Sequence, residues 1–323
     1  VHADAEDDEE DEGRRHGQDD APDAGSAAAR HGGYGRYGRA GRSTAWWWLP
    51  DVTAAGWRAE LDLRCELRDD RSRLVGKRQL GPLTLQRPFY PEGDVCHLYL
   101  LHPPGGVVGG DSLRIQVDIA PGAHALATTP GASKFYRSAG ADALLEQRLR
   151  VEAGGVLEWF PQESILFPGA RVRSRTEIAL LGDARFIGWE MLSLGRPVIA
   201  ERFDAGSLSV ALRISRDGRP LLADLLRVTE PRHLDGPAGL RGQPVSGTFV
   251  AVGCNAAMLE ATRGLLAAPQ GLLFGATLLD DLLVARCLAG TTEPMQQVFF
   301  TLWQALRPMV LGRDACAPRI WAT

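Results

Sequence analysis

Cysteine is scarce in this chain of 323 residues, and its placement matches no common ligand or disulfide pattern. The five cysteines are scattered, odd in number and never spaced as CxxC. Structural zinc sites and disulfide-rich scaffolds depend on closely and regularly spaced cysteines. We therefore expect neither kind of site, and the scattered thiols favour a reducing compartment, which predicts a cytoplasmic protein.

Long apolar runs and a strong net charge are missing as well. No stretch reaches the roughly 18 consecutive apolar residues that a membrane-spanning helix needs, so we expect no membrane partner. The first residues are acidic, where a secretory signal would be basic and then apolar. A formal net charge of −4 gives no reason to expect nucleic acid as a partner.

Large apolar side chains are rare in the first 45 residues. An acidic block from Asp4 to Glu12 precedes sequence rich in Gly, Ala and Asp, and then in Gly, Arg and Tyr. Such a segment cannot bury enough apolar area to offset the entropy of ordering the chain. We therefore predict a disordered tail over residues 1–45 and a single domain over residues 46–323.

Helical periodicity is scarce in the first part of this domain, where apolar and polar residues alternate instead. Alternation with a period of two is typical of half-buried strands. It occurs in "WRAELDLRCEL", "LRIQVDIA", "RVRSRTEIALL" and "SLSVALRI". Asp217-Gly218 and Asp280-Asp281 each separate two apolar runs, which predicts two β-hairpins.

Helical spacing is found late in the chain. One candidate helix runs over about residues 255–268. In the other, Pro294 suits the first turn, and apolar residues follow Met295 at i+3, i+4, i+7 and i+11. Pro308 and Gly312 are expected to end this helix. The predicted fold class is therefore mostly β, with a few α-helices mainly toward the C-terminus.

Nucleotide-binding and hydrolase motifs are absent. The stretch "HPPGGVVGGD", residues 102–111, is rich in glycine, but it lacks the GxGxxG spacing and is followed by a strand pattern. Walker A and G-x-S-x-G motifs do not occur. The adjacent Cys96 and His97 would point to opposite faces of a strand. We predict no catalytic residues, and we interpret these glycines as allowing sharp turns and close backbone approach.

Five side chains that can bind divalent cations lie in or beside turn-rich or apolar stretches. They are His102, Asp111, Glu158, Glu163 and Glu190. Buried carboxylates are costly unless they are paired or bind an ion. Each of these residues could equally lie on the solvated face of a strand. Their spacing indicates no closed metal cage, but it is compatible with a sparse polar path.

The segment "TTPGASKFYRS" places Lys134, Tyr136 and Arg137 after a Pro-Gly turn. Loops carry much of the binding in proteins, so these three side chains are candidates for a partner-docking patch. A basic loop tip whose side chains lie over aromatic neighbours would have the same sequence. Both interpretations remain open at this point.

One protein family has motifs that closely resemble several long segments of this chain. The UreD (also called UreH) urease accessory proteins contain segments similar to "QRPFYPEG", "CHLYLLHPPGGVVGGD", "PGASKFYRS", "LEWFPQE", "FPGA", "LGRPVI" and "PRIW". The resemblance extends from about Trp57 to the C-terminus, and the tail has no counterpart in it. It implies a UreD-like domain in which stacked β-sheets form a helix-like, β-solenoid-like arrangement.

The resemblance also implies a role without catalysis. Such proteins form a scaffold with UreF and the GTP-bound GTPase UreG, dock on apo-urease, and conduct nickel to its active site. A conduit for a hydrated dication needs oxygen donors that hold the ion weakly, because a cage of His and Cys would trap nickel. On this basis the five candidate ligands named above are predicted to line a transient nickel path, with no tightly bound cofactor.

Two hypotheses from other classes of protein remain. A hydrolase or isomerase on a β-solenoid scaffold would use Glu158 and Glu163 as an acid–base pair. These two carboxylates could meet only across the turn at Pro161. A carbohydrate- or peptide-binding module is the third hypothesis, and only the aromatic content points to it.

Overall fold

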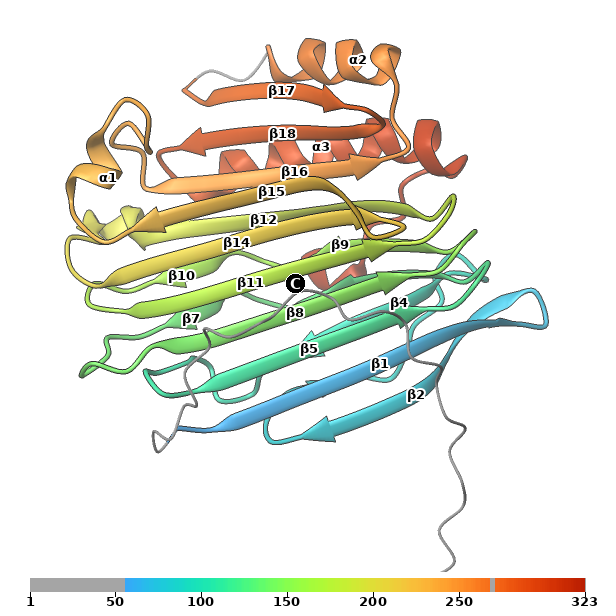
Figure 1. The fold of residues 1–323 in the computed structure, drawn as a ribbon, viewed down its shortest axis with the longest axis horizontal. Coiled ribbons are helices and arrows are strands. Elements are labelled where there is room, and N and C mark those ends of the chain that lie inside the picture. Colours follow the sequence, from blue (N-terminus) through green and yellow to red (C-terminus); the bar gives the residue numbers. More distant parts are fainter. Residues whose placement is uncertain (1–55, 268–270, 323) are drawn as a thin grey trace, which may run out of the picture. The chain divides into compact units, whose positions relative to one another are not determined.

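The computed structural model describes residues 56–267 and 271–322, which belong to one compact unit, Asp51–Thr323. The predicted tail and its boundary with the domain lie outside the described residues and stay predictions. Two β-sheets lie face to face, and two of the helices pack beside the second sheet (Figure 1). The helices occur late in the chain, as predicted: α1 (Arg232–Asp235), α2 (Ala256–Leu266) and α3 (Thr292–Leu311).

Within the described residues, the first sheet has seven strands in the order β15-β14-β11-β8-β5-β1-β2. Their bounds are β1 (Arg58–Arg68), β2 (Arg71–Leu80), β5 (Ser112–Ile119), β8 (Ala143–Val151), β11 (Arg171–Leu180), β14 (Ser207–Arg216) and β15 (Arg219–Val228). In β5 and β11 every second residue is buried, because one face packs on the core and the other faces solvent. The four alternating segments of the sequence are β1, β5, β11 and β14, so those predictions are confirmed.

The second sheet has eleven strands in the part of the chain that the structure describes, with the main order β17-β18-β16-β12-β9-β6-β4-β3. The bounds on this path are β3 (Thr84–Leu85), β4 (Cys96–Leu101), β6 (His124–Thr128), β9 (Val156–Phe160), β12 (Arg185–Arg196), β16 (Val245–Val252), β17 (Leu273–Leu279) and β18 (Leu282–Ala289). The short strands β7 (Ser133–Phe135), β10 (Ser164–Leu166) and β13 (Glu201–Arg202) pair off this path.

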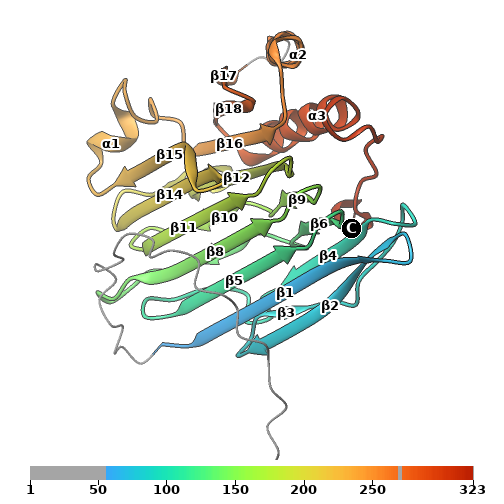
Figure 2. The same cartoon turned by 45° about the vertical axis from the view of Figure 1, so that its right-hand side comes forward.

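The chain passes back and forth between the two sheets and adds strands to each as it goes. Parallel pairing joins β1, β5, β8, β11 and β14 in the first sheet. Parallel pairing likewise joins β4, β6, β9 and β12 in the second. Successive coils therefore stack along one direction (Figure 2). This stacking confirms the predicted mostly-β, β-solenoid-like fold.

Both predicted hairpins are confirmed. β14 and β15 pair antiparallel around Asp217 and Gly218, whose φ angles of 50° and 79° fit a tight turn. β17 and β18 pair antiparallel around Asp280, with a φ of 52°. The helix predicted near residue 255 is also present as α2, and the Asn255 side chain caps it by accepting a hydrogen bond from the Met258 backbone N–H at 3.1 Å.

The prediction that Pro308 ends the last helix was wrong. Pro308 lies inside α3, which continues to Leu311 and ends at Gly312 in the left-handed conformation. A proline in the last turn removes only one backbone hydrogen bond of the helix. Val310 and Leu311 pack against the apolar layer beneath α3, and this contact holds the final turn in place.

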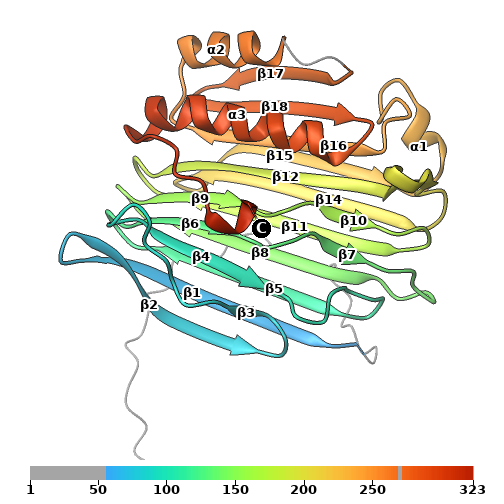
Figure 3. The same ribbon diagram turned by 180° about the vertical axis from the view of Figure 1, so that it is seen from behind.

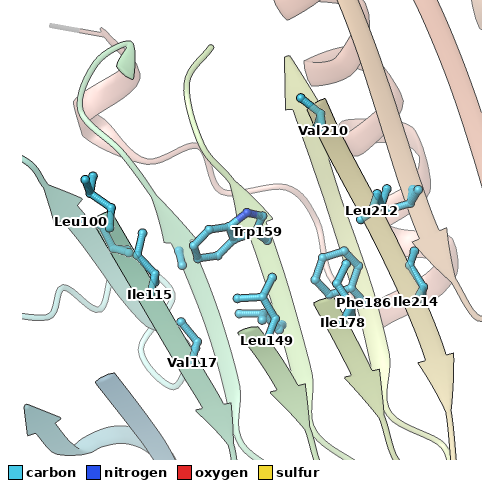
Figure 4. Packing of buried hydrophobic residues seen from close by; sticks show 14 of the residues in the cluster. Leu100, Ile115, Val117, Leu149, Trp159, Ile178, Phe186, Val210, Leu212 and Ile214 are labelled. Atoms are coloured by element: carbon cyan, nitrogen blue, oxygen red, sulfur yellow. The ribbon is translucent and has the colours of Figure 1, made fainter. Parts of the chain in front are cut away.

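Two apolar layers stabilise the unit. The first lies between the two sheets, where Trp159 and Phe186 of the second sheet meet side chains such as Leu149 of the first (Figure 4). The second lies between the second sheet and α3, which packs over β12, β16 and β18 (Figure 3). These three strands are therefore covered on both faces. No helix among the described residues is both long and apolar enough to span a lipid bilayer.

Candidate functional site

Two cavities adjoin between the two sheets, and the second is open to solvent, because many of the residues that line it are exposed. The first has a volume of about 240 Å³ and is lined by inward-facing residues of both sheets. It reaches the surface beside Gly105, Gly131 and Lys134, which line it and are exposed. The second has a volume of about 550 Å³ and is lined by parts of β14, β15, β16, β17 and β18 and by the loop 237–241.

The two cavities meet at three shared side chains, Glu190, Leu212 and Thr248. The two cavities therefore adjoin at these side chains, in the layer between the sheets. We call the two cavities together the inter-sheet path. One end is bordered by the loop after β4, and the other by β15 and β17.

Strand register places the polar residues of the path in one row. Thr248 of β16 lies opposite Glu190 of β12 on one side and opposite Arg286 of β18 on the other. Directly opposed residues of antiparallel strands project from the same face of a sheet. Since Phe186 and Leu192 of β12 face the first sheet, Glu190 between them faces it too.

Glu190 is the carboxylate at the junction of the cavities. It makes no hydrogen bond or ion pair with any of the residues that the structure describes. Burial raises the pKa of Glu190 to about 7, and the negative charge of Asp224 adds to the effect. Glu190 is half-buried, and a carboxyl that has no protein partner and a pKa near neutrality can take up either a proton or a cation.

Asp224 and Arg286 lie at the second cavity and were not predicted from the sequence. Nη2 of Arg286 donates to Oδ2 of Asp224 at 2.6 Å, and both residues line this cavity. The two are 62 residues apart in the chain, on β15 and β18. Their pairing depends on how the two sheets stack, and no local motif signals it.

His102 lines the first cavity, as a predicted ligand should, and is partly buried. Burial lowers the pKa of His102, and the nearby Asp111 opposes this effect. The imidazole is therefore neutral at pH 7 and has a nitrogen lone pair for a cation. His102 and Glu190 are the two predicted path residues that line the inter-sheet path within the described chain.

Asp111 has a different environment. Its two carboxylate oxygens accept backbone N–H groups, from Trp57 at 2.8 Å and from Val108 at 2.9 Å. These bonds fix the glycine-rich loop that precedes β5. A Cβ added at Gly106 would lie 2.0 Å from Cε2 of Tyr136, and one added at Gly109 would lie 2.1 Å from Oγ of Ser138. The interpretation of these glycines as permitting close approach is confirmed.

Glu158 and Glu163 both project toward α3, on the opposite face of the second sheet. Glu158 is fully buried, and its partners are His124 at 2.8 Å, Nε1 of Trp303 at 2.6 Å and Arg307 at 2.9 Å. Despite its burial, the hydrogen bonds and charges of His124 and Arg307 hold the pKa of Glu158 below its usual value.

Glu163 accepts a hydrogen bond from Nε2 of Gln296 at 2.9 Å. Gln296 and Arg307 are eleven residues apart on α3, which corresponds to about 16 Å along the helix axis. Glu158 and Glu163 therefore bind well-separated parts of α3 and do not form a paired acid and base. The geometry gives no support to the hydrolase or isomerase hypothesis.

The structure does not gather the predicted ligands into one cage. Among residues 56–267 and 271–322, no group of three or more His, Cys, Asp or Glu side chains is placed to hold a metal ion. The arrangement instead provides single donors spaced along the inter-sheet path. The assignment of each predicted residue to a nickel path stays a prediction.

The predicted docking residues lie at the mouth of the first cavity. Lys134 lines the cavity and is exposed. The ring of Tyr136 packs on Phe167 with centroids 4.7 Å apart and remains 38% exposed. Arg137 is exposed beside them. The three side chains therefore share one accessible surface, and their docking role stays a prediction.

Several known proteins similar to this chain carry the same description. A family model described as "UreD urease accessory protein" matches residues 57–322. The urease accessory protein UreD of Alcanivorax borkumensis is 49% identical over 273 residues, which cover 83% of this chain and 93% of that protein. The protein of the same name from Klebsiella aerogenes is 46% identical over 268 residues, with 83% and 97% covered.

Proposed function

Because this chain belongs to the UreD family of urease accessory proteins, we propose that it matures urease by conducting nickel through the inter-sheet path to the apoenzyme. In this proposal the chain is a scaffold without catalytic activity. It assembles with UreF and the GTPase UreG and docks on apo-urease. Nickel is its cargo, held transiently and passed on.

The observation that carries the proposal is the unpaired carboxyl of Glu190 at the junction of two cavities. A half-buried carboxylate without a protein partner is costly to desolvate, so its presence at this junction favours a functional explanation. A dication arriving at this point would replace the proton of Glu190 and relieve the cost of its burial. Because Glu190 is one donor and not a cage, the ion can leave again.

The remaining polar groups of the path also favour transit. His102 offers a neutral imidazole in the first cavity, and Thr248 offers a hydroxyl beside Glu190. In the second cavity Asp224 is neutralised by Arg286, so it does not add a second free carboxylate. Weak, separated donors let an ion enter and leave, as they do in ion-conducting pores.

The first test is assembly. The full chain should co-purify with UreF, UreG and apo-urease, and the complete set should activate urease when nickel and bicarbonate are supplied. Failure of the chain to join these proteins at any salt concentration would contradict the proposal.

The second test concerns the path. Glu190→Gln keeps the shape of the side chain but removes the charge, so the variant should still assemble and should lose most of the nickel-dependent activation. The matched control is Glu293→Gln, which alters an exposed carboxylate in the first turn of α3 and should activate normally. Equal activation by both variants would remove Glu190 from the path.

A further inference from the structure

We propose that the mouth of the first cavity is a docking surface for a protein that presents an apolar pocket bordered by carboxylates, and that Val198 and Ile199 enter this pocket. The inference rests on the proposed function, under which the partner at this mouth is apo-urease. The inter-sheet path does not by itself show which surface of the chain binds apo-urease. The inference assigns that surface and the apolar side chains that anchor it.

The anchor is the short 3₁₀ turn Pro197–Ile199 between β12 and β13, which we call the apolar knob. Val198 is 85% exposed and Ile199 is 61% exposed. The exposure of Val198 is the highest among the exposed large apolar side chains of the described residues. Two adjacent branched apolar side chains at a protruding turn gain nothing from this position in an isolated chain. Burial in a partner's pocket would remove them from water.

The apolar knob is held rigidly at its base. Arg196 and Glu201 pair across β12 and β13 through two hydrogen bonds, each of 2.7 Å. The Ala200 backbone N–H donates to the carbonyl of Pro197 at 3.0 Å, and Ala200 adopts the left-handed conformation with φ 56°. A non-glycine residue seldom adopts this strained conformation. A preorganised turn loses little conformational entropy on binding.

A stack of side chains joins the apolar knob to the mouth of the cavity. The guanidinium of Arg196 lies 4.7 Å from the ring centroid of Phe167, and Phe167 packs on Tyr136 at 4.7 Å. The Tyr136 ring in turn lies against Gly106, which lines the first cavity. The loops after β7, β10 and β12 lie at the same end of the sheets (Figure 1). The knob and the mouth are therefore parts of one surface.

The charges at this surface indicate the chemistry of the partner. Lys134 and Arg137 are exposed, and neither forms an ion pair with a carboxylate within the described ranges. A partner with carboxylates around its pocket would supply the missing anions. Complementary charge at a rim mainly speeds association and fixes orientation, while the apolar anchor slows dissociation.

The proposed function assigns the partner of this surface. Under it nickel leaves the inter-sheet path into apo-urease, and we assign the mouth of the first cavity to that exit. The acceptor there is then apo-urease.

The test compares binding of purified full-length variants to immobilised apo-urease. In the double variant Val198→Asp, Ile199→Asp, dissociation should quicken and binding should weaken by about thirtyfold or more, as expected for loss of an interface anchor. Thermal unfolding should not change, because both side chains are exposed. The control is Met309→Asp, at a 45% exposed apolar residue of α3, which should bind like the native chain.

Two further arms complete the test. If the aspartate variant unfolds early, Val198→Ser, Ile199→Ser repeats the measurement without new charges. The pair Lys134→Glu, Arg137→Glu should slow association with apo-urease and reduce its dependence on salt. The same variants are also measured against UreF.

The outcomes separate the two proposals. If the knob variants bind apo-urease as tightly as the native chain does, the docking surface is overturned and the proposed function stands. Loss of binding to UreF, with apo-urease binding intact, overturns the assignment of the partner. A native chain that binds neither protein overturns the proposed function and the docking surface together.

Discussion

Arg307 of α3 and Glu158 of β9 form an ion pair in which neither side chain has solvent exposure. Nη2 of Arg307 lies 2.9 Å from Oε1 of Glu158, and Arg307 also pairs with Glu92 at 2.7 Å. His124 and Trp303 bind the remaining lone pairs of Glu158. This cluster joins the last helix to the middle of the second sheet through charge-assisted hydrogen bonds.

Replacing Arg307 by Met should destabilise the protein by about 3–5 kcal/mol, because Glu158 would remain buried without its cation. Urea unfolding measures the difference. The control is Arg263→Met, which removes an ion pair with Glu260 that is mostly exposed to solvent, and its cost should stay below about 1 kcal/mol. A cost for Arg307→Met as small as that of the control would contradict a structural role for the cluster.

The same cluster predicts sensitivity to acid. Burial by itself raises the pKa of Glu92, but hydrogen bonds from His97 and Arg307 outweigh burial and bring it to about 2. A depressed folded-state pKa gives stability that is complete above the unfolded value of 4.5 and is lost as pH falls toward 2. The free energy of unfolding should therefore decline over that interval. The decline should be shallower in Glu92→Gln, and identical slopes would count against this assignment.

The alternation of apolar and polar residues predicted the strands of the first sheet far better than those of the second sheet. In β5 and β11 one face meets solvent, so the sequence carries the period of two. In β4, β6 and β9 both faces are covered, and nearly every residue is buried. Such strands appear in the sequence as continuous apolar runs, which do not show which face a residue occupies.

The sequence also does not show which face of the sheet the candidate-site residues occupy. Glu158 and Glu190 both interrupt apolar runs in the sequence, yet Glu158 faces α3 and Glu190 faces the first sheet. No local signal separates the two, because each lies on a strand that is buried on both sides. Asp224 was missed for another reason. It lies on β15 in an alternating segment, and only the stacking of the sheets brings it to the cavity.

The raised pKa of Glu190 predicts a second pH dependence of the unfolding free energy, opposite in sign to the one expected from Glu92. Burial raises the folded-state pKa of Glu190 from 4.5 to about 7. Its stabilising contribution is therefore complete below pH 4.5 and is lost as pH rises through about 7. In metal-free buffer, Glu190→Gln should be more stable than the native chain at pH 8. Unfolding curves from pH 4.5 to 8 measure this, and parallel curves for the two proteins would contradict it.

Thr248 offers a steric test of the inter-sheet path, because it lines both cavities at their junction. A phenyl ring in place of its hydroxyl and methyl groups would project into the shared space beside Glu190 and close the passage. Thr248→Phe should therefore assemble with its partners and lose most of the nickel-dependent urease activation. Added bulk in an interior costs about 1–3 kcal/mol, so the unfolding free energy is measured alongside.

The control for this variant is Thr277→Phe, which adds the same ring at an exposed position on β17 and should activate urease normally. Thr248→Ser keeps the hydroxyl and the open junction and should also activate. If Thr248→Phe folds and activates as well as Thr277→Phe, the ion does not pass this junction. The two cavities would then be separate hollows, because a single continuous route cannot carry nickel past a ring that fills it.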